Sequence, residues 1–178
     1  GGNTSVEYIP ISPNHLYTIS CYIKAMSGAS GNKYPSLYAY DIDKKMIQYY
    51  QCTEGFSTST ATTLAQPLHR GDTVIYATDL SKWNTGTSNY YFYVAIFGYK
   101  NSLGEVYPDL TYTQDAPRFG TYSDKSHIDK ENNTITLNAA YTGADRPAGT
   151  TICQSTEGST YYYPFGAVSV SSVQDWVF

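Results

Sequence analysis

The chain has 178 residues, and its 11 basic and 15 acidic side chains make up only 15% of it, against about 25% in an ordinary soluble domain. A net charge of −4 without a basic cluster argues against nucleic-acid binding, and an apolar content of 41% is too high for a disordered chain. The longest uncharged stretch, 83–99, is interrupted by Asn, Thr, Gly and Ser, so we expect no membrane insertion.

Alternation of apolar and polar residues with a period of two dominates the chain, and helical periodicity is nearly absent. The strands expected in the first half are 15–24, 35–40, 46–51, 73–77 and 90–97. The polar, short side chains of 41–45 predict a hairpin turn. Both faces of 90–97 are apolar, so this strand is expected to be central and covered on both sides.

The second half continues the same pattern. The strands expected there are 134–139, 150–154, 161–165 and 167–171, with Ile135 and Leu137 pointing inward. Turn or loop signals stand at 28–32, 58–63, 70–72, 84–89, 129–133 and 141–149. Short strands separated by turns every dozen or so residues predict an all-β, antiparallel β-sandwich. No linker divides the chain, so we expect one module over 1–178, excised from a longer polypeptide because it opens with Gly1-Gly2 and no Met.

The three cysteines, Cys21, Cys52 and Cys153, show no CxxC spacing, so a zinc site is not expected. Cys21 alternates with apolar neighbours on one strand face, which predicts a buried, reduced thiol. A disulfide between two of the three cysteines stays open.

Catalytic motifs are missing from the sequence: it contains no GxSxG, HExxH, P-loop or GxGxxG pattern. The three histidines are isolated among turn and strand-edge residues: His15, His69 and His127. No acidic pair stands in apolar surroundings that would raise the pKa of one carboxyl, as glycoside hydrolysis requires. Two pairs, Asp41/Asp43 and Asp72/Asp79, lie in turn-like sequence, where Asp is favoured for local hydrogen bonds. We therefore expect a chain that is not an enzyme.

A structural calcium ion is the one cofactor that the sequence suggests. Calcium takes six to eight oxygen ligands and needs no contiguous motif. Glu7 and Asp175 would supply carboxylates if the two ends of the chain pair, whereas Asp41-x-Asp43 lacks the remaining EF-hand positions. The alternative is that these are ordinary carboxylates of turns and strand edges.

Tyrosine is in large surplus, with 20 residues against 6 Phe and 2 Trp. A tyrosine ring can cover the C–H face of a sugar while nearby polar groups bind its hydroxyls. The aromatic candidates for ligand binding are Trp83, Tyr38, Tyr40, Tyr90, Tyr91 and Tyr93. Trp83, which a polar loop follows, is the best candidate for an exposed ring. The alternative is that these rings fill the interior or pack between strands, because Tyr has a high β propensity.

Two early segments resemble the opening of jelly-roll carbohydrate-binding modules. The first is 8–24, with Tyr8-Ile9-Pro10-Ile11 leading to Tyr22-Ile23-Lys24, and the second is the hairpin 37–47, with Asp43-Lys44-Lys45 at its turn. Three later segments resemble a more particular group found in phage tail fibres and tailspikes. They are 68–76 running on to Trp83, then 105–113, and 147–151 with 160–163. Together, in this order, the segments cover most of 6–165.

The resemblance implies a galactose-binding-like β-sandwich that decorates the receptor-binding fibre of a virion. Such fibres are usually homotrimers that attach to polysaccharide on the host surface. The resemblance carries no ligand-binding motif, so the candidate residues come from the aromatic pattern alone. Two alternatives remain: a structural spacer whose tyrosines pack the trimer, and an accessory domain of a polysaccharide-degrading enzyme.

Overall fold

The structure is a computed structural model. It describes residues 7–12, 14–18, 20, 31–33, 36–85, 90–121, 124, 126–158 and 168–170. Contacts divide the chain into two compact units, one formed by Gly1–Pro35 with Phe165–Phe178 and the other by Ser36–Pro164. Regular structure among the described residues is almost entirely strand, with helix confined to the short 3-10 turns η1 (Tyr49–Gln51) and η2 (Thr58–Thr60). The all-β class is confirmed, and the expectation of one module stays a prediction.

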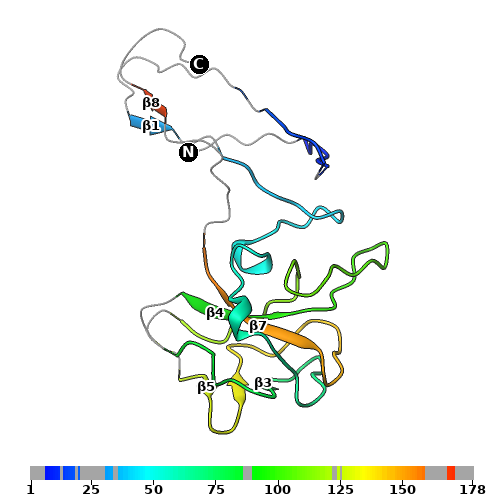
Figure 1. Cartoon of the computed structure of the whole chain (residues 1–178), viewed down its shortest axis with the longest axis vertical. Helices are drawn as coiled ribbons and strands as arrows, with labels where there is room; N and C mark the ends of the chain where they lie inside the picture. The colour runs from blue at the N-terminus through cyan, green and yellow to red at the C-terminus, as the bar shows by residue number, and fades with distance from the viewer. Residues whose placement is uncertain are drawn as a thin grey trace. The chain divides into compact units, whose positions relative to one another are not determined.

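The first unit contains a two-stranded sheet. Strand β1 (Gly31–Lys33) pairs antiparallel with β8 (Val168–Val170), which brings together segments from near the two ends of the chain (Figure 1). The prediction of a strand at 167–171 is confirmed, and the turn predicted at 28–32 gives way to β1 from Gly31 onward because β8 pairs with it.

The strand predicted at 15–24 is wrong for its described part. Residues 15–18 belong to no strand, and Leu16 and Tyr17 are exposed over 98% and 46% of their surfaces. Instead of pairing with a strand, Tyr17 makes local contacts: its hydroxyl accepts from the Ser12 N–H at 2.7 Å, and its ring meets that of His15. Cys21 lies outside the described residues.

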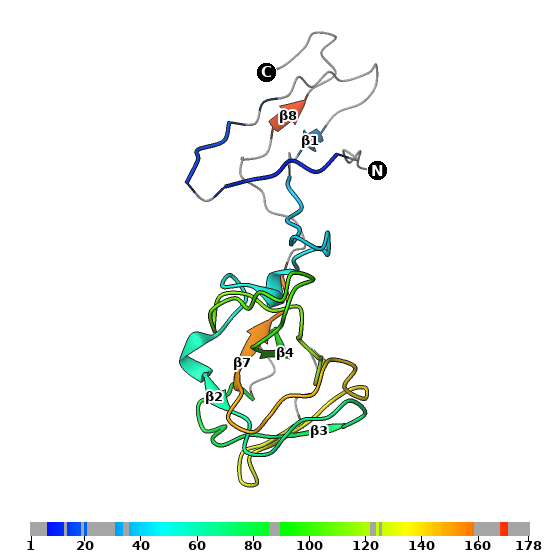
Figure 2. The same ribbon diagram turned by 90° about the vertical axis from the view of Figure 1, so that its right-hand side faces the viewer.

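The second unit holds two antiparallel sheets of three strands each among its described residues (Figures 1 and 2). One has the order β2-β7-β4, with bounds Thr62–Thr63, Thr151–Thr156 and Tyr91–Ile96. The other has the order β3-β6-β5, with bounds Val74–Tyr76, Thr134–Thr136 and Ile128–Asp129. Strands β3, β4, β6 and β7 fall on predicted strands, and Ile135 and Leu137 are buried as expected.

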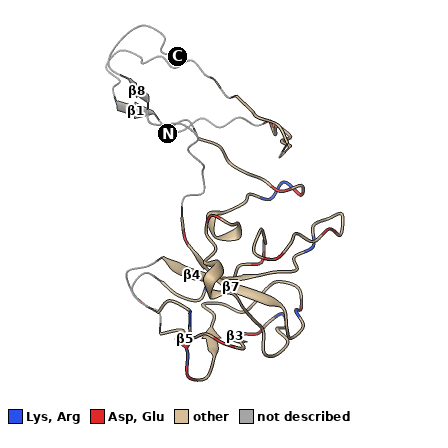
Figure 3. Cartoon of the chain, viewed as in Figure 1, with Lys and Arg blue, Asp and Glu red and all other residues tan. Residues whose placement is uncertain are grey.

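Strand β4 is buried from Phe92 to Ile96, so the prediction that both of its faces are covered is confirmed. The centre of the sheet, however, is β7 and not β4. The second edge of β4 is hydrogen-bonded to the irregular segment 115–119; the Ile96 N–H, for example, donates to the carbonyl of Asp115 at 2.8 Å. Figure 3 shows β4 and β7 without charged residues, while the charges of this unit lie mainly in its loops.

The hairpin predicted around 41–45 is confirmed. Tyr40 and Met46 form an antiparallel bridge, and the Asp41 N–H donates to the carbonyl of Lys45 at 2.9 Å. The return strand predicted over 46–51 is wrong: only the isolated bridge at Met46 forms, because the chain turns into η1 at Tyr49. The loop predicted at 58–63 is replaced by η2 and β2.

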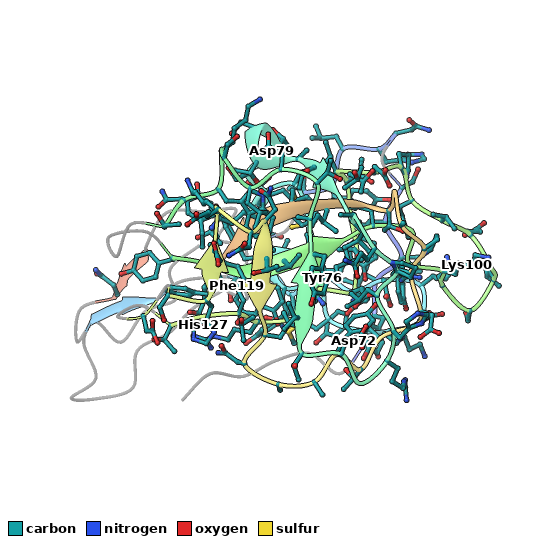
Figure 4. All side chains as sticks on the ribbon, turned by 90° about the horizontal axis from the view of Figure 1, so that it is seen from below. Asp72, Tyr76, Asp79, Lys100, Phe119 and His127 are labelled. Carbon is teal, nitrogen blue, oxygen red and sulfur yellow. The ribbon has the colours of Figure 1, made fainter. Side chains whose placement is uncertain are left out.

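The core of the second unit is shared by both sheets. It contains Leu64, Leu68, Ile75, Ala77, Leu80, Trp83, Val94, Ile96, Phe119, Ile128, Ile135, Leu137, Tyr141 and Ile152. Trp83 is only 1% exposed, so the expectation of an exposed ring is wrong. Its indole N–H donates to the carbonyl of Thr60 at 2.9 Å, and its ring lies 6.0 Å from that of Phe119, which Figure 4 labels. A satisfied N–H removes the main obstacle to burying tryptophan.

Replacing Trp83 by Ala should lower the free energy of unfolding by about 3–5 kcal/mol, because the substitution leaves a large cavity and an unpaired carbonyl at Thr60. Urea denaturation followed by circular dichroism measures the change. Tyr76→Ala is the matched control: Tyr76 is 42% exposed on β3, and its loss should cost about 1 kcal/mol or less. Equal costs for the two variants would contradict the burial of Trp83.

Cys52 and Cys153 are both free thiols. Burial among apolar neighbours raises the pKa of the Cys153 thiol to about 12. Iodoacetamide at about pH 8 should therefore alkylate the half-buried Cys52 and spare Cys153 in the folded protein, and it should label both in urea, as peptide mass spectrometry would show. Labelling of Cys153 under native conditions at the rate seen in urea would refute this arrangement.

Candidate functional site

The candidate site lies where β4 begins and β7 ends. The ladder between these strands continues past Tyr91 and Thr156, because the Glu157 N–H donates to the carbonyl of Tyr90 at 2.7 Å. Tyr90 and Glu157 are thus held as cross-strand neighbours. Together with Gly158 they line a surface hollow of about 380 Å³, here called the Tyr90 hollow.

Aromatic rings support this hollow. The Tyr90 side chain is 54% exposed, and its ring lies edge to face against Phe92, with centres 6.3 Å apart at 73°. Tyr93 is stacked on Tyr50 of η1, with ring centres 3.8 Å apart and planes only 4° from parallel. Aromatic pairs of this kind add about 0.5–1.5 kcal/mol each beyond the burial of their area, so the supporting rings are firmly placed.

The absence of a side chain at Gly158 also shapes the hollow. A Cβ atom at this position would lie 2.5 Å from the ring of Tyr49. Tyr49 therefore packs directly against the backbone of the residue that lines the hollow.

Arg118 joins the rings to the charged edge of the site. Its guanidinium carbon lies 5.4 Å and 5.6 Å from the ring centres of Phe92 and Tyr93, within the range of a cation–π interaction. Its Nη2 lies 3.7 Å from Oε2 of Glu157. Burial raises the pKa of the Tyr93 hydroxyl, with Tyr50 and Glu157 adding to the shift and Arg118 opposing it, so this phenol stays neutral at physiological pH.

The predicted aromatic residues fall into three groups. Tyr90 lines the hollow, Trp83 and Tyr93 are buried with 1% and 9% exposure, and the remaining candidates are half-buried residues that do not line the hollow: Tyr38, Tyr40 and Tyr91. Reasoning from the sequence missed Glu157 and Arg118. Nothing in the sequence pairs the doublet Tyr49-Tyr50 with β4.

The described residues show no set of ligands for the expected calcium ion. Glu7 is exposed, and Asp175 lies outside the part of the chain that the structure describes. Within that part, no three His, Cys, Asp or Glu residues gather closely enough to hold a metal ion. A structural calcium ion stays a prediction.

A second hollow of about 320 Å³ is lined by Glu105, Val106, Tyr107 and Pro108. It lies on the hairpin that begins at Lys100, the residue labelled at the edge of the unit in Figure 4. The Tyr107 ring meets Tyr112 edge to face at 4.9 Å, and the Tyr112 hydroxyl donates to Asp41 at 2.8 Å. This hollow also combines a tyrosine with a glutamate, but Tyr107 is less exposed (37%) than Tyr90.

A buried ion pair joins Asp115 to the loop 141–149. Nη2 of Arg146 lies 3.1 Å from the Asp115 carboxylate, which also accepts a hydrogen bond from the Tyr141 hydroxyl. Burial raises the pKa of the Asp115 carboxyl even though both partners favour its charged form. The sequence did not single out Asp115, because its partners lie about 30 residues further along the chain. Its contacts fix the loop.

Comparison with protein-family models finds no match, and neither the curated proteins nor the solved structures contain a detectable relative. No helix among the described residues is long and apolar enough to cross a membrane.

The raised pKa of Asp115 predicts a pH dependence of stability. The folded state holds this proton more tightly than the unfolded state, so Asp115 stabilises the fold most below the ordinary carboxyl pKa of 3.8 and loses that contribution as the pH rises through its folded value. Asp115→Asn cannot titrate. The advantage of the parent protein over this variant, measured by urea denaturation from about pH 3 to pH 7, should shrink with rising pH. An advantage that grows with pH would show instead that Arg146 outweighs burial.

Proposed function

We propose that the chain is a non-catalytic carbohydrate-binding module and that the Tyr90 hollow is its binding site. The observation that carries the proposal is the exposed Tyr90 ring beside the carboxylate of Glu157 at the rim of a hollow. The two antiparallel sheets of the second unit suit a β-sandwich of the jelly-roll, galactose-binding-like kind, which forms part of the proposal.

The chemistry of the hollow matches what a sugar offers. One face of a pyranose ring is lined with C–H groups and can lie on an aromatic ring, while its hydroxyls donate hydrogen bonds to carboxylate oxygens. Strand pairing and the contact with Phe92 fix Tyr90 in place before any ligand arrives. Ligand binding therefore costs little entropy for ordering the Tyr90 side chain.

The resemblance to phage fibre modules supplies the proposed setting. In a homotrimeric tail fibre or tailspike, each virion would carry several copies of the hollow. Weak binding of each copy to host surface polysaccharide would then suffice. Once one copy has bound, the others meet the same polysaccharide at a high effective concentration. An accessory module of a polysaccharide-degrading enzyme would use the same site in a different parent chain.

The second candidate is a structural spacer, and the fate of the aromatic surplus favours it in part. Trp83, Tyr112 and Tyr141 are buried, and their polar atoms bond to groups of the same chain. These rings serve packing. The spacer hypothesis extends that role to all the tyrosines, including Tyr90.

A glycan array probed with the full chain tests the proposal, with Tyr90→Ala as the diagnostic variant and Tyr76→Ala as the control. Tyr90→Ala should weaken binding to the best glycans about tenfold, which corresponds to about 1.4 kcal/mol for the lost ring contact. Tyr76→Ala removes another exposed tyrosine, 42% against 54% for Tyr90, from β3 and should leave the pattern unchanged. Circular dichroism confirms that both variants fold.

Two results would reject the Tyr90 hollow as the site. The first is no binding to any glycan at high concentration by the folded chain, which would favour the spacer. The second is glycan binding that Tyr90→Ala and Tyr76→Ala weaken equally.

A further inference from the structure

The two charged residues beside the Tyr90 hollow are placed differently. Glu157 lines the hollow, and its side chain is 42% exposed. The Arg118 side chain is 40% exposed but is not among the lining residues: its Nε donates to the carbonyl of Gly120 at 2.9 Å, and its guanidinium lies over the ring of Phe92. A ligand in the hollow therefore meets a carboxylate, while the guanidinium is held on the supporting rings.

The ion pair leaves the Glu157 carboxylate able to bind a ligand. Its distance to Arg118, 3.7 Å, is longer than a hydrogen bond. An ionised carboxylate accepts hydrogen bonds only, through two oxygens with about four lone-pair positions. Two adjacent sugar hydroxyls match that acceptor pair, because each can donate to one oxygen.

We propose that the Tyr90 hollow selects neutral sugars that present two adjacent hydroxyls and rejects uronic acids. The inference rests on the proposed function and names the ligand class of the same site. A sugar carboxylate in the hollow would approach Glu157, and two like charges about 4 Å apart lose about fivefold in affinity even at the dielectric constant of water. The net charge of −4 on the chain acts in the same direction.

The test uses pairs of oligosaccharides of identical linkage that differ only in carrying a hydroxymethyl group or a carboxylate at C5. Mannose with mannuronate and galactose with galacturonate oligomers are two such pairs. The parent chain should bind the neutral member at least about fivefold more tightly in titration calorimetry. Added salt should narrow the difference, because it screens the repulsion at an exposed site.

Glu157→Gln keeps the size of the side chain and removes its charge. This variant should bind the neutral member several-fold more weakly, because a neutral amide accepts hydrogen bonds less strongly, and should lose most of the discrimination against the acidic member. Glu105→Gln, in the second hollow, is the matched control and should change neither affinity.

The outcomes separate the two proposals. Tyr90-dependent binding that prefers the uronic acid, or discrimination that survives in Glu157→Gln, would overturn the ligand class and leave the binding function standing. Absence of binding to every oligosaccharide would overturn both. A preference for neutral sugars that disappears in Glu157→Gln and persists in Glu105→Gln supports the inference.

Discussion

The fully buried amide of Gln154, in the middle of β7, is the interaction on which the second unit depends. Its oxygen accepts from the Asn84 N–H at 2.7 Å, and its nitrogen donates to the Asn84 carbonyl at 2.8 Å. The backbone of the same residue donates to the Thr60 hydroxyl and accepts from the Ser57 N–H, both at 2.9 Å. Gln154 thereby holds two segments in place, 57–60, which contains η2, and the chain at Asn84. Because an unpaired buried amide is costly, the arrangement is strongly specified.

These hydrogen bonds of Gln154 explain the burial of Trp83. Both the N–H and the carbonyl of Asn84 are hydrogen-bonded to the side chain of Gln154. These bonds hold the preceding residue, Trp83, close to η2, where the Thr60 carbonyl accepts a hydrogen bond from the indole N–H. The polar sequence after Trp83 indicates exposure when it is considered alone. In the folded chain, the first of these polar residues is a structural anchor, and the tryptophan that it follows belongs to the core.

Alternation predicted the strands that pack a core face and failed where packing was absent. Strands β3, β6 and β7 follow the pattern because Ile75, Ile135 and Ile152 point into one shared core. At 15–18, where the same pattern begins, Tyr17 is 46% exposed and no strand forms. Periodicity shows which face a strand would bury, but whether a partner covers that face depends on segments far away in the sequence.

The sequence predicted the aromatic part of the candidate site but not its charged part. The tyrosines at 90–93 stand out as an aromatic cluster, and one of them, Tyr90, lines the hollow. Glu157 and Arg118 come from an adjoining strand end and an irregular edge segment, so the register of the pairing decides their place. A shift of a single residue along β7 would turn a different side chain toward Tyr90. No local signal in the sequence contains that information.

Because Gly158 has no side chain, the wall of the hollow can lie directly against the ring of Tyr49. Even one methyl group there would compete with the Tyr49 ring for the same space, and either the ring or the neighbouring backbone would have to move. Among the described residues, the pairs of β4 with β7 run from Ile96–Ile152 to Tyr91–Thr156, and Gly158 is not one of them. A substitution at this one small residue would therefore reshape the wall of the hollow, while the paired residues of β4 and β7 keep their register.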